Sequence, residues 1–239
     1  MDSLETELDR ARSLSVDDLA DAIESIGFEC TRCGACCKAA ECDSDGTDAE
    51  SEPHTATVFP DEIRAIQERE AYDWRDVARP MPYGLTEGAD GRSGETFEWA
   101  LQTDACGDCV FYDESDAASG EKAPTDSQQS GGGECTIYGD RPLVCKTYPF
   151  SVALGGTSQP MGEAVDQEGM VRAHECEGLG RDISRAEAEE LAGALKERAI
   201  RELEEAIDVR DVYEPADPPD GEIVVHDSEG AKSPDGSIR

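Results

Sequence analysis

The ten cysteines are the residues of this 239-residue chain whose type and spacing could do chemistry. Five of them lie between residues 30 and 42, and the other five are spread from residue 106 to residue 176. The first group contains the run Cys-Thr-Arg-Cys-Gly-Ala-Cys-Cys at residues 30–37. Two cysteines separated by two residues can direct both thiolates at one metal ion, and Gly34 lets the backbone curl around that ion. The spacing therefore predicts a thiolate metal site.

The N-terminal run can be divided among metals in more than one way. Cys30, Cys33 and Cys36 follow the pattern C-x-x-C-x-x-C, in which three cysteines can bind three irons of a cuboid cluster while a fourth ligand comes from elsewhere. Neighbours in sequence cannot easily bind one tetrahedral ion together. Cys36 and Cys37 therefore indicate either two adjacent metal sites or a division of roles.

Residues 106–109 form a second Cys-x-x-Cys turn. Cys106 and Cys109 could therefore join Cys30 and Cys33 in a four-cysteine zinc ribbon. One such site would leave six of the ten thiols without a role. The number of thiols thus favours a centre larger than a single zinc ion, while the spacing permits both divisions.

The charge of the chain excludes several classes of partner. The 21 Lys and Arg residues face 56 Asp and Glu residues, so the formal charge is −35. A chain this acidic repels phosphate backbones and anionic lipid headgroups, and we expect neither a nucleic-acid partner nor a membrane partner. The basic residues are 16 Arg and 5 Lys. This combination is typical of proteins adapted to saturated salt, where a screening length of about 3 Å at 1 M makes self-repulsion tolerable.

No stretch of the sequence approaches the roughly 18 consecutive apolar residues of a membrane span. The first twenty residues carry acidic side chains instead of a basic start followed by an apolar run. We therefore expect a cytoplasmic protein. In a reducing compartment, thiols are more often ligands or catalysts than disulfide partners.

The two main cysteine runs are exceptions to the general acidity. Residues 28–38 and residues 135–150 each carry two basic residues and one acidic residue, so each run has a net charge of +1. Four thiolates on Zn²⁺ or on a four-iron cluster leave an anionic site. Nearby cations lower the pKa of a thiol and stabilise that negative charge. The local charge thus favours ligand thiolates over inert core thiols.

Four segments together resemble the YkgJ-type cysteine-cluster family, a zinc- or iron-chelating domain. Residues 28–37 match its C-x-x-C-G-x-C-C motif, and residues 109–111 match its lone cysteine before an apolar residue. Residues 135–150, CTIYGDRPLVCKTYPF, match the pattern C-x-I-Y-x-x-R-P-x-x-C-x-x-[FY]-P-F. Residues 176–180 match the late cysteine near glycines. The resemblance covers about residues 28–180, and the chain looks like a halophilic, archaeal-like member.

The resemblance implies eight metal ligands, while Cys42 and Cys106 lie outside the family pattern. We expect Arg141 to anchor a turn near the site, with a ligand-contact role shared with Pro142 as the alternative. We expect His174 to be an exposed neighbour of the site and not a ligand. The eight implied ligands are Cys30, Cys33, Cys36, Cys37, Cys109, Cys135, Cys145 and Cys176.

Several helices are needed to position these cysteines. Ser15 can cap a helix whose apolar residues repeat at three and four positions, and Gly27 can end it just before the first cysteine. A second helix is predicted to begin near Pro60 and a short one to span residues 73–78. The longest is predicted over residues 184–208, where a Ser and a Glu three residues later form a capping box.

Strand signals are short, at residues 54–59, 96–101 and 110–112. We expect acidic, unstructured inserts at 41–52 and 113–133. The predicted fold is a small, irregular α+β domain stabilised by metal, with peripheral helices and few short strands. We divide the chain into an N-terminal helical segment (1–27), a metal-binding domain (28–183), a C-terminal helix (184–210) and a disordered acidic tail (211–239).

The leading functional hypothesis is an iron–sulfur protein whose cluster serves electron transfer or redox sensing with an unidentified protein partner. The alternative is a zinc-binding structural or chelating module without redox chemistry. A further alternative is an enzyme, either a cluster-dependent oxidoreductase or a cysteine-cluster methyltransferase. It has the least support, because the sequence contains no phosphate-binding glycine loop, dinucleotide fingerprint or catalytic triad pattern.

Overall fold

The computed structural model describes residues 2–39, 53–89, 91–113, 133–159 and 164–239. Within these residues the fold is α+β, with six α-helices and four small sheets, as the sequence predicted. The expected inserts at 41–52 and 113–133 lie outside the described residues, apart from Asp113 and Gly133. None of the helices in the described part of the chain combines the length and the apolarity needed to cross a lipid bilayer.

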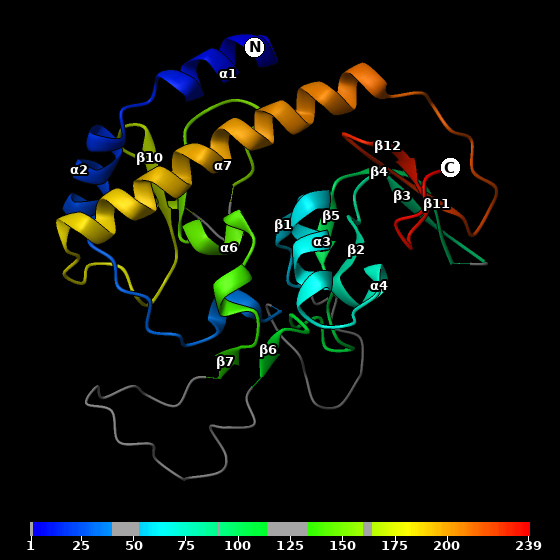
Figure 1. Ribbon diagram of the computed structural model, residues 1–239, viewed down its shortest axis with the longest axis horizontal. Helices are drawn as coiled ribbons and strands as arrows, with labels where there is room; N and C mark the ends of the chain where they lie inside the picture. Colours follow the sequence, from blue (N-terminus) through cyan, green and yellow to red (C-terminus); the bar gives the residue numbers. More distant parts are fainter. Residues whose placement is uncertain (1, 40–52, 90, 114–132, 160–163) are drawn as a thin grey trace.

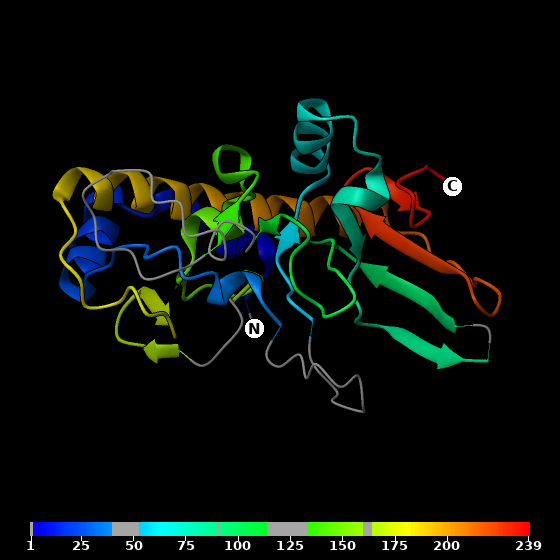
Figure 2. The same ribbon diagram turned by 90° about the horizontal axis from the view of Figure 1, so that it is seen from below.

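Helix α7 (Arg185–Val212) runs along both halves of the molecule, with α1 (Leu4–Ser13) and α2 (Val16–Ile26) packed on it (Figures 1 and 2). The predicted helix starts are confirmed. The Ser15 side chain accepts a hydrogen bond from the Asp18 backbone at the start of α2, and Ser184 and Glu187 form the capping box of α7. Helix α7 continues to Val212, past the predicted end, and Arg210 in this last turn pairs with Glu5 of α1 at 2.6 Å.

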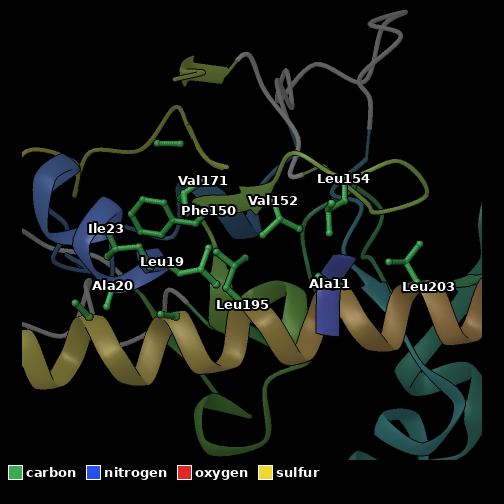
Figure 3. Close-up of a cluster of buried hydrophobic side chains, with 14 of the residues drawn as sticks. Ala11, Leu19, Ala20, Ile23, Phe150, Val152, Leu154, Val171, Leu195 and Leu203 are labelled. Atoms are coloured by element: carbon green, nitrogen blue, oxygen red, sulfur yellow. The ribbon is translucent and has the colours of Figure 1, made fainter. Parts of the chain in front are cut away.

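The first core lies between these three helices and a sheet of strand order β8–β10–β9 (Figure 3). Ile23 of α2, Leu195 of α7 and Phe150 of β8 are almost fully buried in it. We call this cluster of buried residues the first core. The three strands are antiparallel and comprise β8 (Phe150–Val152), β9 (Ala164–Asp166) and β10 (Val171–His174).

The second core lies on the other side of the molecule, where α3 (Pro60–Arg69) and α4 (Trp74–Val77) pack near a three-stranded sheet. Trp74 and Trp99 meet edge to face with ring centroids 5.1 Å apart. Both predicted helices are confirmed. The sheet has the order β1–β5–β2 and comprises β1 (Thr57–Val58), β2 (Ala78–Pro80) and β5 (Trp99–Leu101).

A four-stranded sheet shows that the expected disordered tail at 211–239 is wrong for residues 223–232. Strand β11 (Ile223–Asp227) pairs in parallel with β4 (Gly91–Phe97), and β12 (Gly230–Lys232) and β3 (Leu85–Gly88) complete the order β12–β11–β4–β3. Buried Lys232 lies 2.8 Å from buried Asp227, which also accepts a hydrogen bond from Trp99. The acidic composition misled the prediction, because here the charges are paired inside the sheet.

One buried arginine on α7 fixes the segment that leads into the first core. Arg198 is 2% exposed and donates to Glu202 at 2.8 Å, to the Thr147 hydroxyl at 3.1 Å and to the Ser158 carbonyl at 2.6 Å. It also donates to the Phe150 carbonyl at 3.3 Å. The guanidinium therefore holds both ends of the stretch that connects the last cysteine-bearing helix to β8.

We expect Arg198→Met to destabilise the fold by about 3–5 kcal/mol, because it leaves the Glu202 carboxylate buried without its cation. Arg201→Met is the matched control on the same helix, since Arg201 pairs with Asp61 at the exposed surface. That variant should lose no more than about 1 kcal/mol. Urea unfolding at fixed salt measures both values, and equal losses would contradict the role assigned to Arg198.

Candidate metal centre

The N-terminal cysteine run folds as a tight turn followed by a 3-10 helix, η1 (Ala35–Cys37). Gly34 adopts the left-handed conformation at φ 78°, and the Cys37 backbone N–H donates to its carbonyl at 2.8 Å. A Cβ at position 34 would lie 2.0 Å from the Tyr112 hydroxyl. Glycine is therefore required twice here, for its backbone conformation and for the close approach of the tyrosine.

Tyr112 ties the cysteine run to two other segments. Its hydroxyl donates to the Cys33 carbonyl at 3.4 Å and accepts from the Gly133 backbone at 2.9 Å. Tyr112 also begins β6 (Tyr112–Asp113), which pairs antiparallel with β7 (Glu134–Cys135) and sets Tyr112 opposite Cys135. Cys109 joins the same cluster because its backbone N–H donates to the Cys37 carbonyl at 2.8 Å.

Cys145 lies on the short helix α6 (Leu143–Thr147), whose start is held by a glutamate from α3. The Glu62 carboxylate accepts from the Leu143 backbone at 2.9 Å and from the Phe59 backbone at 3.0 Å. One side chain thus caps two helices. Burial raises the pKa of Glu62. This carboxylate therefore joins α3 of the second core to the helix that carries Cys145.

Cys176 reaches the site through backbone pairing with the start of the cysteine run. The Glu29 N–H donates to the Gly178 carbonyl at 3.0 Å, and Phe28 and Leu179 form an isolated antiparallel bridge. The Gly178 N–H donates to the Cys176 sulfur at 3.4 Å. This pairing brings Cys176 beside Cys30, although Cys176 lies 146 positions later in the chain.

These segments enclose a cavity of about 340 Å³. The aromatic side chains of Phe111, Tyr112, Tyr138 and Tyr148 form part of its wall. Cys33 and Cys176 do not line it. The cysteines that do are Cys30, Cys36, Cys37, Cys109, Cys135 and Cys145.

All eight cysteines named by the family pattern are free thiols in the structure. Cys106 is disulfide-bonded, so the zinc-ribbon division that used it with Cys109 is wrong. Cys106 is therefore an exception to the expectation that the thiols are more often ligands or catalysts than disulfide partners. Cys42 lies outside the described residues.

The eight free thiols are not gathered at one point. Among the residues that the structure describes, no three Cys, His, Asp or Glu side chains are close enough together to hold a single ion. The sulfurs of the adjacent Cys36 and Cys37 are 4.0 Å apart. As a donor set, six thiols in a partly aromatic pocket fit thiophilic metals such as zinc or the irons of a cluster, and not Ca²⁺ or Mg²⁺.

Burial favours the protonated form of four of the eight free cysteines. It raises the pKa of Cys109 and of Cys176 to about 11, and it also raises the pKa of Cys135 and of Cys145. Negative charge on neighbouring thiolates raises each of these pKa values further. Thiolates can therefore accumulate here only if a metal cation compensates their charge.

Two arginines in the cavity wall, Arg32 and Arg141, place positive charge beside the cysteines. Arg141 donates to the Tyr138 carbonyl at 3.0 Å, and its guanidinium lies 3.7 Å from the centre of the Tyr138 ring. Arg32 approaches the same ring at 4.7 Å. The predicted turn-anchoring role of Arg141 is confirmed. Its charge also lowers the pKa of Cys135 and of Cys145, against the larger effect of burial.

His174 is not the exposed neighbour that the sequence suggested. It is 3% exposed, and its Nε2 lies 2.9 Å from the Ser151 hydroxyl across the β8–β10 pairing. Ala173 and His174 are both buried, and the pairing of β10 with β9 shifts register between them, so the burial of His174 does not follow from strand alternation and could not be seen in the sequence. We therefore assign His174 to the packing of that sheet.

Comparison with known proteins gives one family. The CxxCxxCC model, described as "Putative zinc- or iron-chelating domain", matches residues 29–177, which is more than half of the chain. No curated protein and no solved structure gave a significant match. All eight free cysteines fall within the matched stretch.

We expect metal affinity to fall as the pH is lowered. Because the folded apo protein holds its thiols above their ordinary pKa, each thiolate that binds metal must first release a proton, and affinity should drop about tenfold per pH unit for each proton displaced. Zn²⁺ titrations between pH 6 and pH 8 at constant salt measure this. An affinity independent of pH would show that thiols are not the ligands.

Tyr112→Phe should weaken metal binding about tenfold, because it removes the hydroxyl that joins Cys33 and Gly133. Tyr138→Phe is the matched control, since it keeps the ring on which the arginines stack. It should bind metal as the unmodified protein does. Competition with a chromophoric chelator gives both affinities, and equal effects of the two changes would contradict the assigned role.

Proposed function

The chain belongs to the CxxCxxCC family of zinc- or iron-chelating domains, and we propose that it binds an iron–sulfur cluster for electron transfer or redox sensing. Metal binding by the cysteine region follows from the family. The choice of an iron–sulfur cluster is our own, and it depends on the shape of the site and on the number of thiols.

The size of the cavity is the observation that carries the proposal. A structural zinc site is a closed tetrahedron with Zn–S distances of about 2.3 Å, which leaves no space between metal and ligands. Here six thiols line about 340 Å³. A cluster of several irons and sulfides, held by thiolates at its corners, suits such a space better than one ion does.

The eight free cysteines are the proposed ligands, and the residues around them have supporting roles. The positive charges of Arg32 and Arg141 offset the negative charge of bound thiolates. The rings of Tyr112 and Tyr148 limit access of water, and a low dielectric and few hydrogen bonds to sulfur tune the potential of a cluster. When bound, the cluster would supply one-electron chemistry.

We also propose the finer features that the sequence suggested. The acidity and the excess of 16 Arg over 5 Lys support a halophilic, YkgJ-type member. We place it in a cytoplasmic setting in which the eight free thiols stay reduced while Cys106 is held in a disulfide. For the domain division, residues 28–183 remain the metal-binding unit, with helices from 1–27 and 184–210 packed on it.

Anaerobic purification in high salt, followed by visible spectroscopy and metal analysis, tests the proposal. We expect a coloured protein with iron and acid-labile sulfide in equal amounts, and loss of the colour in the variant with all eight proposed ligands changed to Ser. Changing Cys42 and Cys106 to Ser together should leave the colour intact. A colourless protein with stoichiometric zinc and no sulfide would instead establish the zinc module.

A further inference from the structure

The adjacent thiols of Cys36 and Cys37 are placed to react with each other, and we propose that they close into a reversible disulfide that serves as the redox-sensing element of the site. This inference rests on the proposed function, since it names the regulation of the same thiols. The closing reaction itself involves only this chain and a small disulfide, so it can be followed in the metal-free protein.

The geometry of the pair gives the first reason. The two sulfurs are hydrogen-bonded at 4.0 Å, and both side chains line the cavity. Both are free thiols, and among the described residues no other two free thiols are hydrogen-bonded to each other. A disulfide has an S–S bond of about 2.05 Å, so the two sulfurs need to approach by only about 2 Å.

The backbone around the pair has room to adjust. The 3-10 helix η1 is a single turn, closed by hydrogen bonds from the Cys37 N–H to the Gly34 carbonyl at 2.8 Å and from the Lys38 N–H to the Ala35 carbonyl at 3.4 Å. Hydrogen bonds in a 3-10 helix have poorer geometry than those in an α-helix. The peptide between the two cysteines can therefore turn without breaking a longer helix or a sheet.

An oxidant can reach the pair, because Cys36 is exposed. Ala39, two residues after the pair, donates its backbone N–H to the Asp108 carboxylate at 2.8 Å. This contact ties the cysteine run to the loop that carries Cys106, which is already disulfide-bonded. An oxidised cysteine and the reduced pair thus belong to the same part of the molecule.

The reaction needs a small-molecule disulfide as oxidant, and oxidised glutathione is one. The thiolate of one cysteine attacks a glutathione sulfur, which forms a mixed disulfide and releases one reduced glutathione. The sulfur of the other cysteine then attacks the bound cysteine sulfur, which closes the Cys36–Cys37 bond and releases the second reduced glutathione. The two protons and two electrons lost by the pair end on the two glutathione thiols.

The adjacency of the two cysteines makes the bond easy to reverse. Neighbouring Cα atoms are about 3.8 Å apart, whereas the Cα atoms of ordinary disulfides are about 4.4–6.8 Å apart. A disulfide closed over a shorter distance is strained and more readily reduced, as regulatory disulfides are. In the oxidised pair neither sulfur is a thiolate, so two of the eight proposed metal ligands are withdrawn. Disulfide and metal thus exclude each other at this pair.

Mass spectrometry of the full-length apo protein tests the inference. The metal-free chain is incubated with oxidised glutathione, its free thiols are alkylated, and trypsin then cuts after Arg32 and Lys38 to release the peptide 33–38, which holds three cysteines. We expect this peptide to lose two hydrogens and to carry a single alkyl group, on Cys33. Dithiothreitol should restore three alkylated thiols, and loading with Zn²⁺ before the oxidant should prevent the loss.

Cys33→Ser separates this bond from a Cys33–Cys36 disulfide, which the C-x-x-C spacing permits. The variant should still lose two hydrogens and carry no alkyl group on this peptide. The control with both Cys42 and Cys106 changed to Ser should behave as the unmodified protein does.

Three alkylated thiols after excess oxidised glutathione, a peptide that keeps glutathione, or an alkyl group on Cys36 or Cys37 would each overturn the inference. Closure that Zn²⁺ does not prevent would overturn the link to metal binding. The outcome is separate from that of the proposed function, because it is measured in the apo protein. A colourless zinc protein whose pair closes contradicts only the iron–sulfur proposal, and a coloured protein whose pair stays open contradicts only the disulfide.

Discussion

Buried thiols without a cation are the constraint on which the rest of this structure depends. Ionised sulfurs in a low-dielectric environment repel one another, and burial, together with negative charge on neighbouring thiolates, raises the pKa of Cys109 and Cys176 to about 11. The family to which the chain belongs binds zinc or iron, and such a metal would convert this unfavourable gathering of sulfurs into a link among four distant segments. The cysteines are therefore both the functional site and a large part of what can hold the fold together.

The two hydrophobic cores are small, in keeping with an aromatic content of 5%. The first is built mainly on Leu, Ile, Val and Ala between three helices and a narrow sheet, and the second on two tryptophans and a few aliphatic residues. Helix α7 runs along both halves (Figures 1 and 2). Small cores of this kind commonly need a metal or disulfides for stability, and the cysteine segments lie where the two cores meet.

Charge is distributed to suit this arrangement. The chain as a whole is at −35, yet arginines and lysines concentrate beside the cysteine runs. Arg32 and Arg141 approach one tyrosine ring at the cavity wall, and Lys38 lies 5.5 Å from the centre of the Tyr112 ring. Acidic residues elsewhere form exposed ion pairs of small energetic value. Buried Arg198 and Lys232 are different, since each satisfies carboxylates that are themselves buried.

The sequence by itself determined the features that depend on short spacing. The Ser caps of α2 and α7, the glycine turn at Gly34 and the identity of the thiol-rich segments all follow from residues a few positions apart, where local sterics and hydrogen bonds decide the outcome. The tertiary structure alone decided what depends on distant pairing. Strand β11 forms because β4, about 130 residues earlier, offers a parallel edge, and this pairing overrides an acidic composition that predicts disorder. The position of Cys176 is of the same kind, because the hydrogen bond from the Glu29 N–H to the Gly178 carbonyl brings it beside the first cysteine run, and spacing along the chain carries no record of that.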